Sequence, residues 1–130
     1  MAIKHLVPFL VLPLAGCLTS GSSDSLAPSA GLTALGGGLI GQNPVASQLP
    51  SEVKAKALAA EFQALQYAPA GQPVVWADDG IKGEVVSTQP YRIGSQDCRG
   101  YTHTIEGVGQ PVKAVGAACK TPNGYWKPVA

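Results

Sequence analysis

Two cysteines, Cys98 and Cys119, constrain the fold of this 130-residue chain more than any other feature. A β-hairpin turn centred between Val108 and Gly109 would place them directly opposite each other. The same register pairs large side chains with small or β-branched ones, namely Tyr101 with Gly116, His103 with Ala114 and Ile105 with Val112. Because opposed cysteines at a non-hydrogen-bonded pair come within disulfide reach, we expect a disulfide-stapled hairpin. Two reduced, buried thiols are the alternative.

The sequence around the third cysteine, Cys17, is typical of a lipoprotein signal peptide. A short polar segment and an apolar stretch over residues 6–14 precede Ala15 and Gly16. This order is that of a lipobox, in which the signal peptidase cuts before a cysteine whose thiol carries a diacylglycerol. An uncleaved membrane anchor is the alternative, but the apolar stretch is shorter than the roughly 20 residues that span a bilayer. We therefore expect residues 1–16 to be removed and the chain to be held at the membrane by its lipid.

Export and charge limit the kinds of partner. Leu18 follows the expected lipidated cysteine at a position where Asp often retains enterobacterial lipoproteins in the inner membrane, so we expect an outer-membrane location. The exported chain enters an oxidising compartment, which favours a disulfide. Without Lys4 the mature chain carries eight basic and eight acidic side chains and no basic run. This balance argues against a nucleic-acid partner.

The segment after the signal peptide, residues 17–49, consists mostly of Gly, Ser, Ala, Leu and Pro. Small residues recur four apart, at Ala30, Ala34 and Gly38 and at Gly37 and Gly41. This glycine-zipper-like spacing would allow close helix packing in lipid. A helix in or on the membrane and a flexible glycine-rich linker are the two interpretations. Under either, the segment is a tether, and we expect the folded domain to span residues 50–130.

Residues from 51 onward have the pattern of an amphipathic helix. Ser51 is suited to cap its N-terminus, and Glu52 is favourable in its first turn. The expected apolar stripe consists of Ala55, Leu58, Phe62 and Leu65. The other faces would carry Lys54, Lys56, Glu61 and Gln63.

Beyond this helix, short runs rich in Val, Thr, Tyr and Trp are separated by turn residues. We expect strands at residues 73–77, 83–88, 98–106, 112–119 and 125–129. The sequence Asp78-Asp79-Gly80 is typical of a hairpin turn. The predicted fold class is therefore α+β, with one N-terminal helix followed by a small antiparallel sheet of about four or five strands.

Several stretches together resemble one known family. They are residues 59–66 and 72–76, the run Pro90, Tyr91, Arg92, Gln96, Asp97, Cys98, Arg99, Tyr101, Thr102 and Thr104, and the run Gly116, Ala118, Cys119, Lys120, Pro122, Asn123, Gly124 and Trp126. With the lipobox, they resemble the rickettsial 17 kDa common surface antigen family of alphaproteobacterial outer-membrane lipoproteins. Relatives usually carry a longer glycine zipper, which is shortened here to about residues 31–41. The resemblance implies a surface-antigen or structural role and brings no catalytic residues.

Few residues of the chain could carry chemistry. His103 is the only histidine of the mature chain, and Asp97 and Ser95 are merely nearby in sequence. We expect His103 to be a polar residue on a strand and not a general base. A metal site would need several converging His, Cys or carboxylate ligands, so we expect no metal and no cofactor.

Three residues are candidates for contact with a partner: Arg92, Arg99 and Trp126. The two arginines flank Gln96 and Asp97 and could bind a carboxylate or a phosphate, or form an ion pair with Asp97. Trp126 could join other aromatic residues in a platform for a carbohydrate or a protein, or could belong to the core.

Two classes of function follow. The first is a non-enzymatic outer-membrane lipoprotein, anchored through Cys17, that is exposed as an antigen or contributes to envelope integrity. Its partners would be an envelope or host protein, without a small-molecule substrate. The second is a binding module that inhibits an enzyme such as lysozyme, with its contacts in the loops 94–97 or 121–124.

Overall fold

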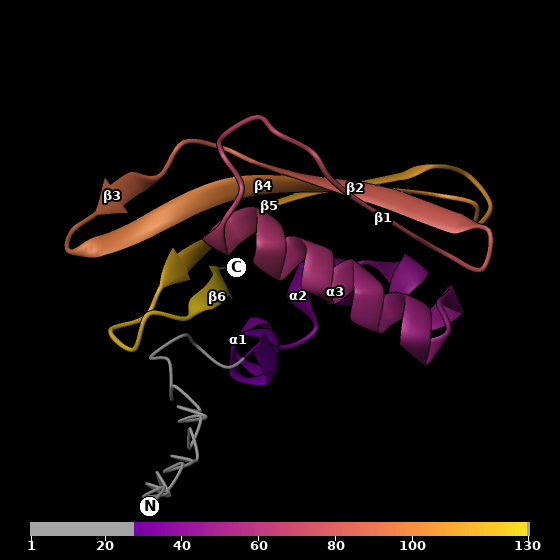
Figure 1. Cartoon of the computed structure of the whole chain (residues 1–130), viewed down its shortest axis with the longest axis horizontal. Helices are drawn as coiled ribbons and strands as arrows, with labels where there is room; N and C mark the ends of the chain where they lie inside the picture. The colour runs from indigo at the N-terminus through magenta and orange to yellow at the C-terminus, as the bar shows by residue number, and fades with distance from the viewer. Residues whose placement is uncertain (1–27, 130) are drawn as a thin grey trace, which may run out of the picture.

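The computed structural model describes residues 28–129, so Cys17 and the expected signal peptide lie outside the described residues. A six-stranded antiparallel sheet forms the larger part of the fold (Figure 1). Its strands are β1 (Val74–Asp78), β2 (Ile81–Ser87), β3 (Tyr91–Ile93), β4 (Gln96–Glu106), β5 (Val112–Lys120) and β6 (Trp126–Val129). Their order is β1-β2-β4-β5-β6, and β3 pairs with the beginning of β4. The predicted α+β class is confirmed; the sequence misses only β3, whose three exposed residues show no alternation.

The helices lie on one side of this sheet (Figure 1). They are α1 (Pro28–Leu35), α2 (Gly38–Gly41) and α3 (Ser51–Gln66), and a 3₁₀ helix, η1 (Pro44–Gln48), connects α2 to α3. We term this side of the sheet the covered face; its strand residues include Trp76, Val85, Tyr101, His103, Ile105 and Ala118. Strand residues alternate between the two faces, so the other side, the open face, carries Val75, Glu84, Thr102, Thr104 and Val115.

The long helix α3 is buried over a wider arc than the sequence predicts. Its buried residues are Val53, Ala57, Ala60, Glu61, Phe62, Ala64 and Leu65. Ala55, expected in the apolar stripe, is exposed, and Glu61, expected in solvent, is fully buried. The helix is covered by the sheet on one side and by the N-terminal segment on another, which explains the wider arc. Pro50 occupies the N-cap position and no side chain caps the helix, so the prediction of Ser51 as the cap is wrong.

The N-terminal segment belongs to the core, which corrects the predicted start of the fold at residue 50. Leu35, Leu39, Ile40, Val45 and Leu49 are all buried within it. Small residues make this packing possible. A Cβ at Gly116 on β5 would lie 2.7 Å from Leu39 Cδ1, and a Cβ at Gly31 would overlap the ring of Phe62. The tether interpretation therefore fails for the segment from Leu35 onward, because its apolar side chains contact the domain itself.

The glycine-rich segment packs against the sheet and α3. Neither a membrane helix nor a flexible linker would make these contacts. Gly37 and Gly41 approach each other inside one short turn, where a Cβ on Gly37 would lie 3.1 Å from the Gly41 Cα. Within residues 28–129, no helix is both long and apolar enough to span a bilayer.

The predicted central hairpin is confirmed residue by residue. Strands β4 and β5 pair Cys98 with Cys119, and the two residues form a disulfide with their Cα atoms 4.0 Å apart. The other predicted pairs, Tyr101 with Gly116, His103 with Ala114 and Ile105 with Val112, are also present. The β1–β2 turn is confirmed as well. Asp79 and Gly80 both have positive φ values, of 51° and 76°, as a tight two-residue hairpin turn requires.

Candidate functional site

A carboxylate and an imidazole meet at the centre of the molecule, between α3 and the covered face. His103 Nδ1 lies 2.8 Å from Glu61 Oε2, and both side chains have 0% exposure. On the other side of the ring, Trp76 Nε1 donates to His103 Nε2 at 2.9 Å. Trp76 and His103 also pack edge to face, with ring centroids 5.8 Å apart. Helix α3 thus joins β1 and β4 through a chain of three polar side chains.

The hydrogen bonds of this cluster determine the proton positions. An indole N–H can only donate, so His103 Nε2 accepts and carries no proton. His103 is therefore the neutral tautomer with its proton on Nδ1, which donates to Glu61. The Glu61 carboxylate also accepts from the backbone N–H of Leu39 at 2.7 Å and of Ile40 at 3.2 Å. The carboxylate thus accepts hydrogen bonds from three donors, which satisfy its charge inside the protein and indicate a structural role.

The Glu61 carboxylate also affects the pKa of a neighbouring side chain, Tyr101. Tyr101 is buried, and its hydroxyl has no hydrogen-bond partner within the described part of the chain. Burial raises the pKa of Tyr101 above its ordinary value, and the negative charge of Glu61 raises it further.

The Glu61–His103 pair has the residue types of a catalytic dyad but not the access. Neither side chain reaches solvent, and a general base must come within hydrogen-bond distance of a substrate proton. Asp97 is near His103 in sequence only, because the carboxylate bonded to His103 is that of Glu61. Sequence reasoning missed this pair. A signal was nevertheless present, because Glu61 lies one helical turn from both Ala57 and Leu65, which are buried.

Two of the three residues that could contact a partner form their hydrogen bonds inside the protein instead. Arg99 is 5% exposed, and its Nη1 donates to the carbonyl oxygens of Ala64 at 3.2 Å and Leu65 at 2.9 Å. A guanidinium suits these carbonyls, because they form the negative end of α3. Burial lowers the pKa of Arg99 from its usual value. Trp126 is 3% exposed, and its indole N–H donates to Gln66 Oε1 at 2.9 Å. For Trp126 the structure therefore shows the alternative of a place in the core, and Arg99 is bonded inside the protein.

Arg92 is the predicted contact residue that does lie on the surface. Its Nε is 3.1 Å from Asp97 Oδ1, and both side chains are exposed. The expected ion pair of Asp97 is therefore formed with Arg92 and not with Arg99.

Two of the hollows on the surface are lined by polar side chains. The first, of about 390 Å³, lies between the β3–β4 and β5–β6 loops. Its lining consists of Ser95, Gln96, Asp97, Lys120, Thr121, Pro122 and Gly124. The structure thus brings together the two loops that the sequence analysis considered separately. Among the residues 28–129, no group of His, Cys, Asp and Glu is arranged to hold a metal ion.

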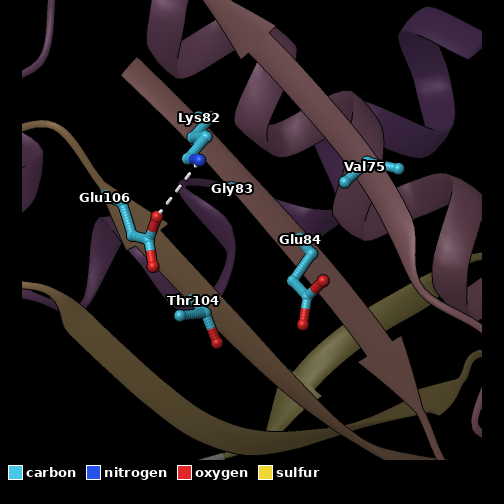
Figure 2. Close-up of a pocket in the computed structure, with 6 residues that line it drawn as sticks. All are labelled: Val75, Lys82, Gly83, Glu84, Thr104 and Glu106. Atoms are coloured by element: carbon cyan, nitrogen blue, oxygen red, sulfur yellow. Dashed lines mark ion pairs between the residues drawn. The ribbon is translucent and has the colours of Figure 1, made fainter.

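The second hollow, of about 280 Å³, lies on the open face of β1, β2 and β4. Figure 2 shows Glu84, Thr104 and Glu106 side by side over these strands, with Val75 at the edge. Lys82 Nζ lies 3.5 Å from Glu106 Oε2. The hollow is shallow and exposed, and its carboxylates face solvent.

Comparison with known proteins places the chain in a family. Residues 63–127 match the family described as 17 kDa outer membrane surface antigen. The chain belongs to this family. The 17 kDa surface antigen of Rickettsia bellii is 40% identical over 70 residues, which cover 52% of this chain and 44% of the relative. Those of Rickettsia conorii and Rickettsia prowazekii are 41% and 39% identical over the same length and the same shares of each chain.

The family match explains which features belong to the shared domain. The chain spans less than half the length of these curated surface antigens. The matched region contains β1 to β5 and the first half of β6, with both cysteines of the disulfide and His103, whereas Glu61 and the N-terminal helices lie before it. No solved structure shows a significant match to the chain. The match thus includes most of the sheet and only the end of α3, whereas most of α3 and the segment of residues 28–49, termed here the N-terminal cover, lie before it.

Proposed function

We propose that this chain is an outer-membrane lipoprotein with a structural, non-enzymatic role, displayed as a surface antigen and anchored by lipid at Cys17. The match to the 17 kDa outer membrane surface antigen family carries this proposal. The lipobox at Cys17 supports the anchor, because a diacylated, N-acylated cysteine binds a membrane far more firmly than a single acyl chain does. The buried state of Glu61 and His103 supports the absence of catalysis, since it leaves them no route to a substrate.

Metabolic labelling with palmitate tests the anchor. Wild-type protein should carry the label and fractionate with the outer membrane, whereas Cys17→Ala should remain an unlabelled precursor. The double variant Cys98→Ser, Cys119→Ser is the matched control, because it removes cysteines that are joined in a disulfide and should keep the label. Label that persists in Cys17→Ala would contradict the anchor.

A second candidate function is a binding module that inhibits an enzyme such as lysozyme. One observation favours it: the loops around residues 94–97 and 121–124 line a single hollow with several polar side chains. The purified mature chain should then inhibit lysozyme, and Gln96→Ala should weaken the inhibition. Gln110→Ala, at the opposite end of β4, is the control and should not. If the wild-type chain leaves lysozyme activity unchanged, this candidate is rejected for that enzyme.

A further inference from the structure

Apolar side chains gather on the open face of the sheet. Five of the six exposed large apolar residues belong to it by strand alternation: Val75 (75% exposed), Val115 (69%), Ile93 (58%), Val129 (46%) and Tyr91 (42%). The sixth, Tyr67, follows α3. A solvated face of an antiparallel sheet is normally polar, and gathered exposed apolar residues are typical of an interaction surface.

The middle of the open face, formed by β2, β4 and β5, is nearly symmetric about β4. One row across the sheet runs from Val86 on β2 through Thr102 to Val115 on β5. The next row runs from Glu84 through Thr104 to Lys113. Valines therefore flank β4 at equal distances in the first row, and opposite charges flank it in the second.

We propose that a second copy of this chain packs against the open face, about a two-fold axis that runs parallel to β4. This rotation places β2 of one copy over β5 of the other. Glu84 then faces Lys113 of the second copy, and the symmetry repeats this contact on the other side of the axis. Val86 faces Val115 of the second copy in the same way. The small threonines of β4 meet at the axis, where they permit the roughly 10 Å separation of packed sheets.

The charges of the open face favour a second copy over an anionic membrane surface. The face carries Lys82, Lys113 and Lys127 beside Glu84 and Glu106, so it has no strongly basic patch of the kind that binds anionic lipid. Lys82 also neutralises Glu106 within one copy, at 3.5 Å. What remains is a pattern complementary to itself after rotation, as an isologous dimer requires.

The axis determines the size of the contact. Strand β1 lies beside the end of β4 and β6 beside its beginning, so the rotation places neither of these strands over the other. The contact therefore consists of β2, β3, β4 and β5, where about 25 residues of about 4.8 Å by 3.4 Å each give roughly 400 Å² per copy. Two copies would bury about 800 Å², the size of a weak, reversible interface.

The direction of the axis also fits two anchored copies. Rotation about an axis parallel to β4 leaves the strands of the two copies running in the same direction. Both N-terminal segments then leave the dimer at the same end, so both chains can start from one membrane. This fit rests on the lipid anchor proposed above, whereas the packing of the two faces does not. Lost palmitate labelling with an intact dimer would reject the anchor and leave the interface standing.

Cross-linking of the full-length protein in its membrane tests the dimer. Packed sheets lie too far apart for a direct disulfide, so we would use Thr104→Cys with a short bismaleimide that reacts with free thiols only. Thr104 lies near the axis, and this variant should give a strong dimer band. Lys54→Cys, exposed on α3, is the control and should not. Unchanged melting temperatures would show that both variants fold. Equal cross-linking of the two variants, or none in Thr104→Cys, would overturn the proposal.

Charge reversal then tests the orientation of the two copies. Glu84→Lys and Lys113→Glu should each weaken dimerisation in detergent solution by about tenfold or more, because each creates two like-charge contacts. The double variant should return to within about threefold of wild type. A double variant that dimerises less than either single variant would overturn the proposed axis. So would a wild-type chain that stays monomeric while its open face binds anionic vesicles.

Discussion

The two faces of the sheet use similar residue types for different purposes. On the covered face, Glu61 and His103 are completely buried and bonded to each other, to Trp76 and to the backbone of α2. On the open face, Glu84 and Glu106 lie in a shallow exposed hollow beside Lys82 (Figure 2). Removing a buried charged group leaves its partners unsatisfied, whereas water replaces the contacts of an exposed one. Stability should therefore depend on the covered face, and association on the open face.

The largest effect should come from the histidine of the covered face. His103→Ala leaves a cavity and removes a donor from the buried Glu61 carboxylate and an acceptor from Trp76. We expect it to lower the free energy of unfolding by about 3–5 kcal/mol. Thr104→Ala, the next residue but on the open face, should cost less than about 1 kcal/mol. Urea unfolding of the two variants measures the difference, and similar losses would break the contrast between the faces.

The disulfide is the exception to this contrast, because strand alternation places it on the open side of β4 and β5, where both cysteines are nevertheless buried. The cysteines lie 21 residues apart, and closing such a loop stabilises a fold by about 3 kcal/mol in the chain-entropy model. Cys98→Ser, Cys119→Ser should lose about this amount in thermal unfolding. The double variant should melt like reduced wild-type protein. If it melts like oxidised wild type, the staple contributes nothing and covered-face packing alone holds the hairpin.

Two glycines test how tightly the N-terminal cover is held against the covered face. Gly36 and Gly38 both have positive φ, at 61° and 66°. A Cβ at Gly36 meets nothing, whereas one at Gly38 would lie 2.7 Å from Glu61 Oε1 and from Leu58 Cδ1. Gly36→Ala should therefore cost about 1 kcal/mol from backbone strain alone, and Gly38→Ala at least about 1 kcal/mol more. Equal unfolding free energies would mean that α2 does not pack on Glu61.

The smallest effect is a pH dependence of Tyr101. The unfolded phenol loses its proton near pH 10, and the folded one keeps it to higher pH because its pKa is raised. The unfolded state therefore binds fewer protons above pH 10, and stability falls there as pH rises. Tyr101→Phe should leave stability at pH 7 within about 1 kcal/mol of wild type and should reduce the alkaline loss. Tyr91→Phe, exposed on the open face, should reproduce the wild-type profile in urea unfolding at pH 7 to 11.

The sheet can be predicted well from the sequence because the features that determine its strand register are local. The positions of Cys98 and Cys119 and the turn between them determine the register of β4 and β5, and Asp79-Gly80 determines that of β1 and β2. Each of these features depends on residues close to it in the chain or directly across a hairpin.

The N-terminal cover and the buried pair could not be predicted in this way, because their causes are distant in sequence. A glycine-rich segment becomes part of the core only because Gly116 leaves space for Leu39. Glu61 is stable inside only because Leu39, Ile40 and His103 all donate to it. Helical periodicity places position 61 with Ala57 and Leu65, but a charged residue there would normally indicate solvent. Arg99 is misjudged for the same reason, since its partners at the end of α3 lie more than 30 residues away.

One matched pair of substitutions tests the central contrast most directly: Glu61→Gln and Glu84→Gln, compared by urea unfolding at pH 7. Both keep the size of the side chain and remove one negative charge. At position 61 an amide N–H₂ must face at least one of the three donors, so the free energy of unfolding should fall by at least about 2 kcal/mol. At position 84 it should change by less than about 0.5 kcal/mol. Equal losses at the two positions would contradict the account that the covered face holds the fold and the open face is free for a partner.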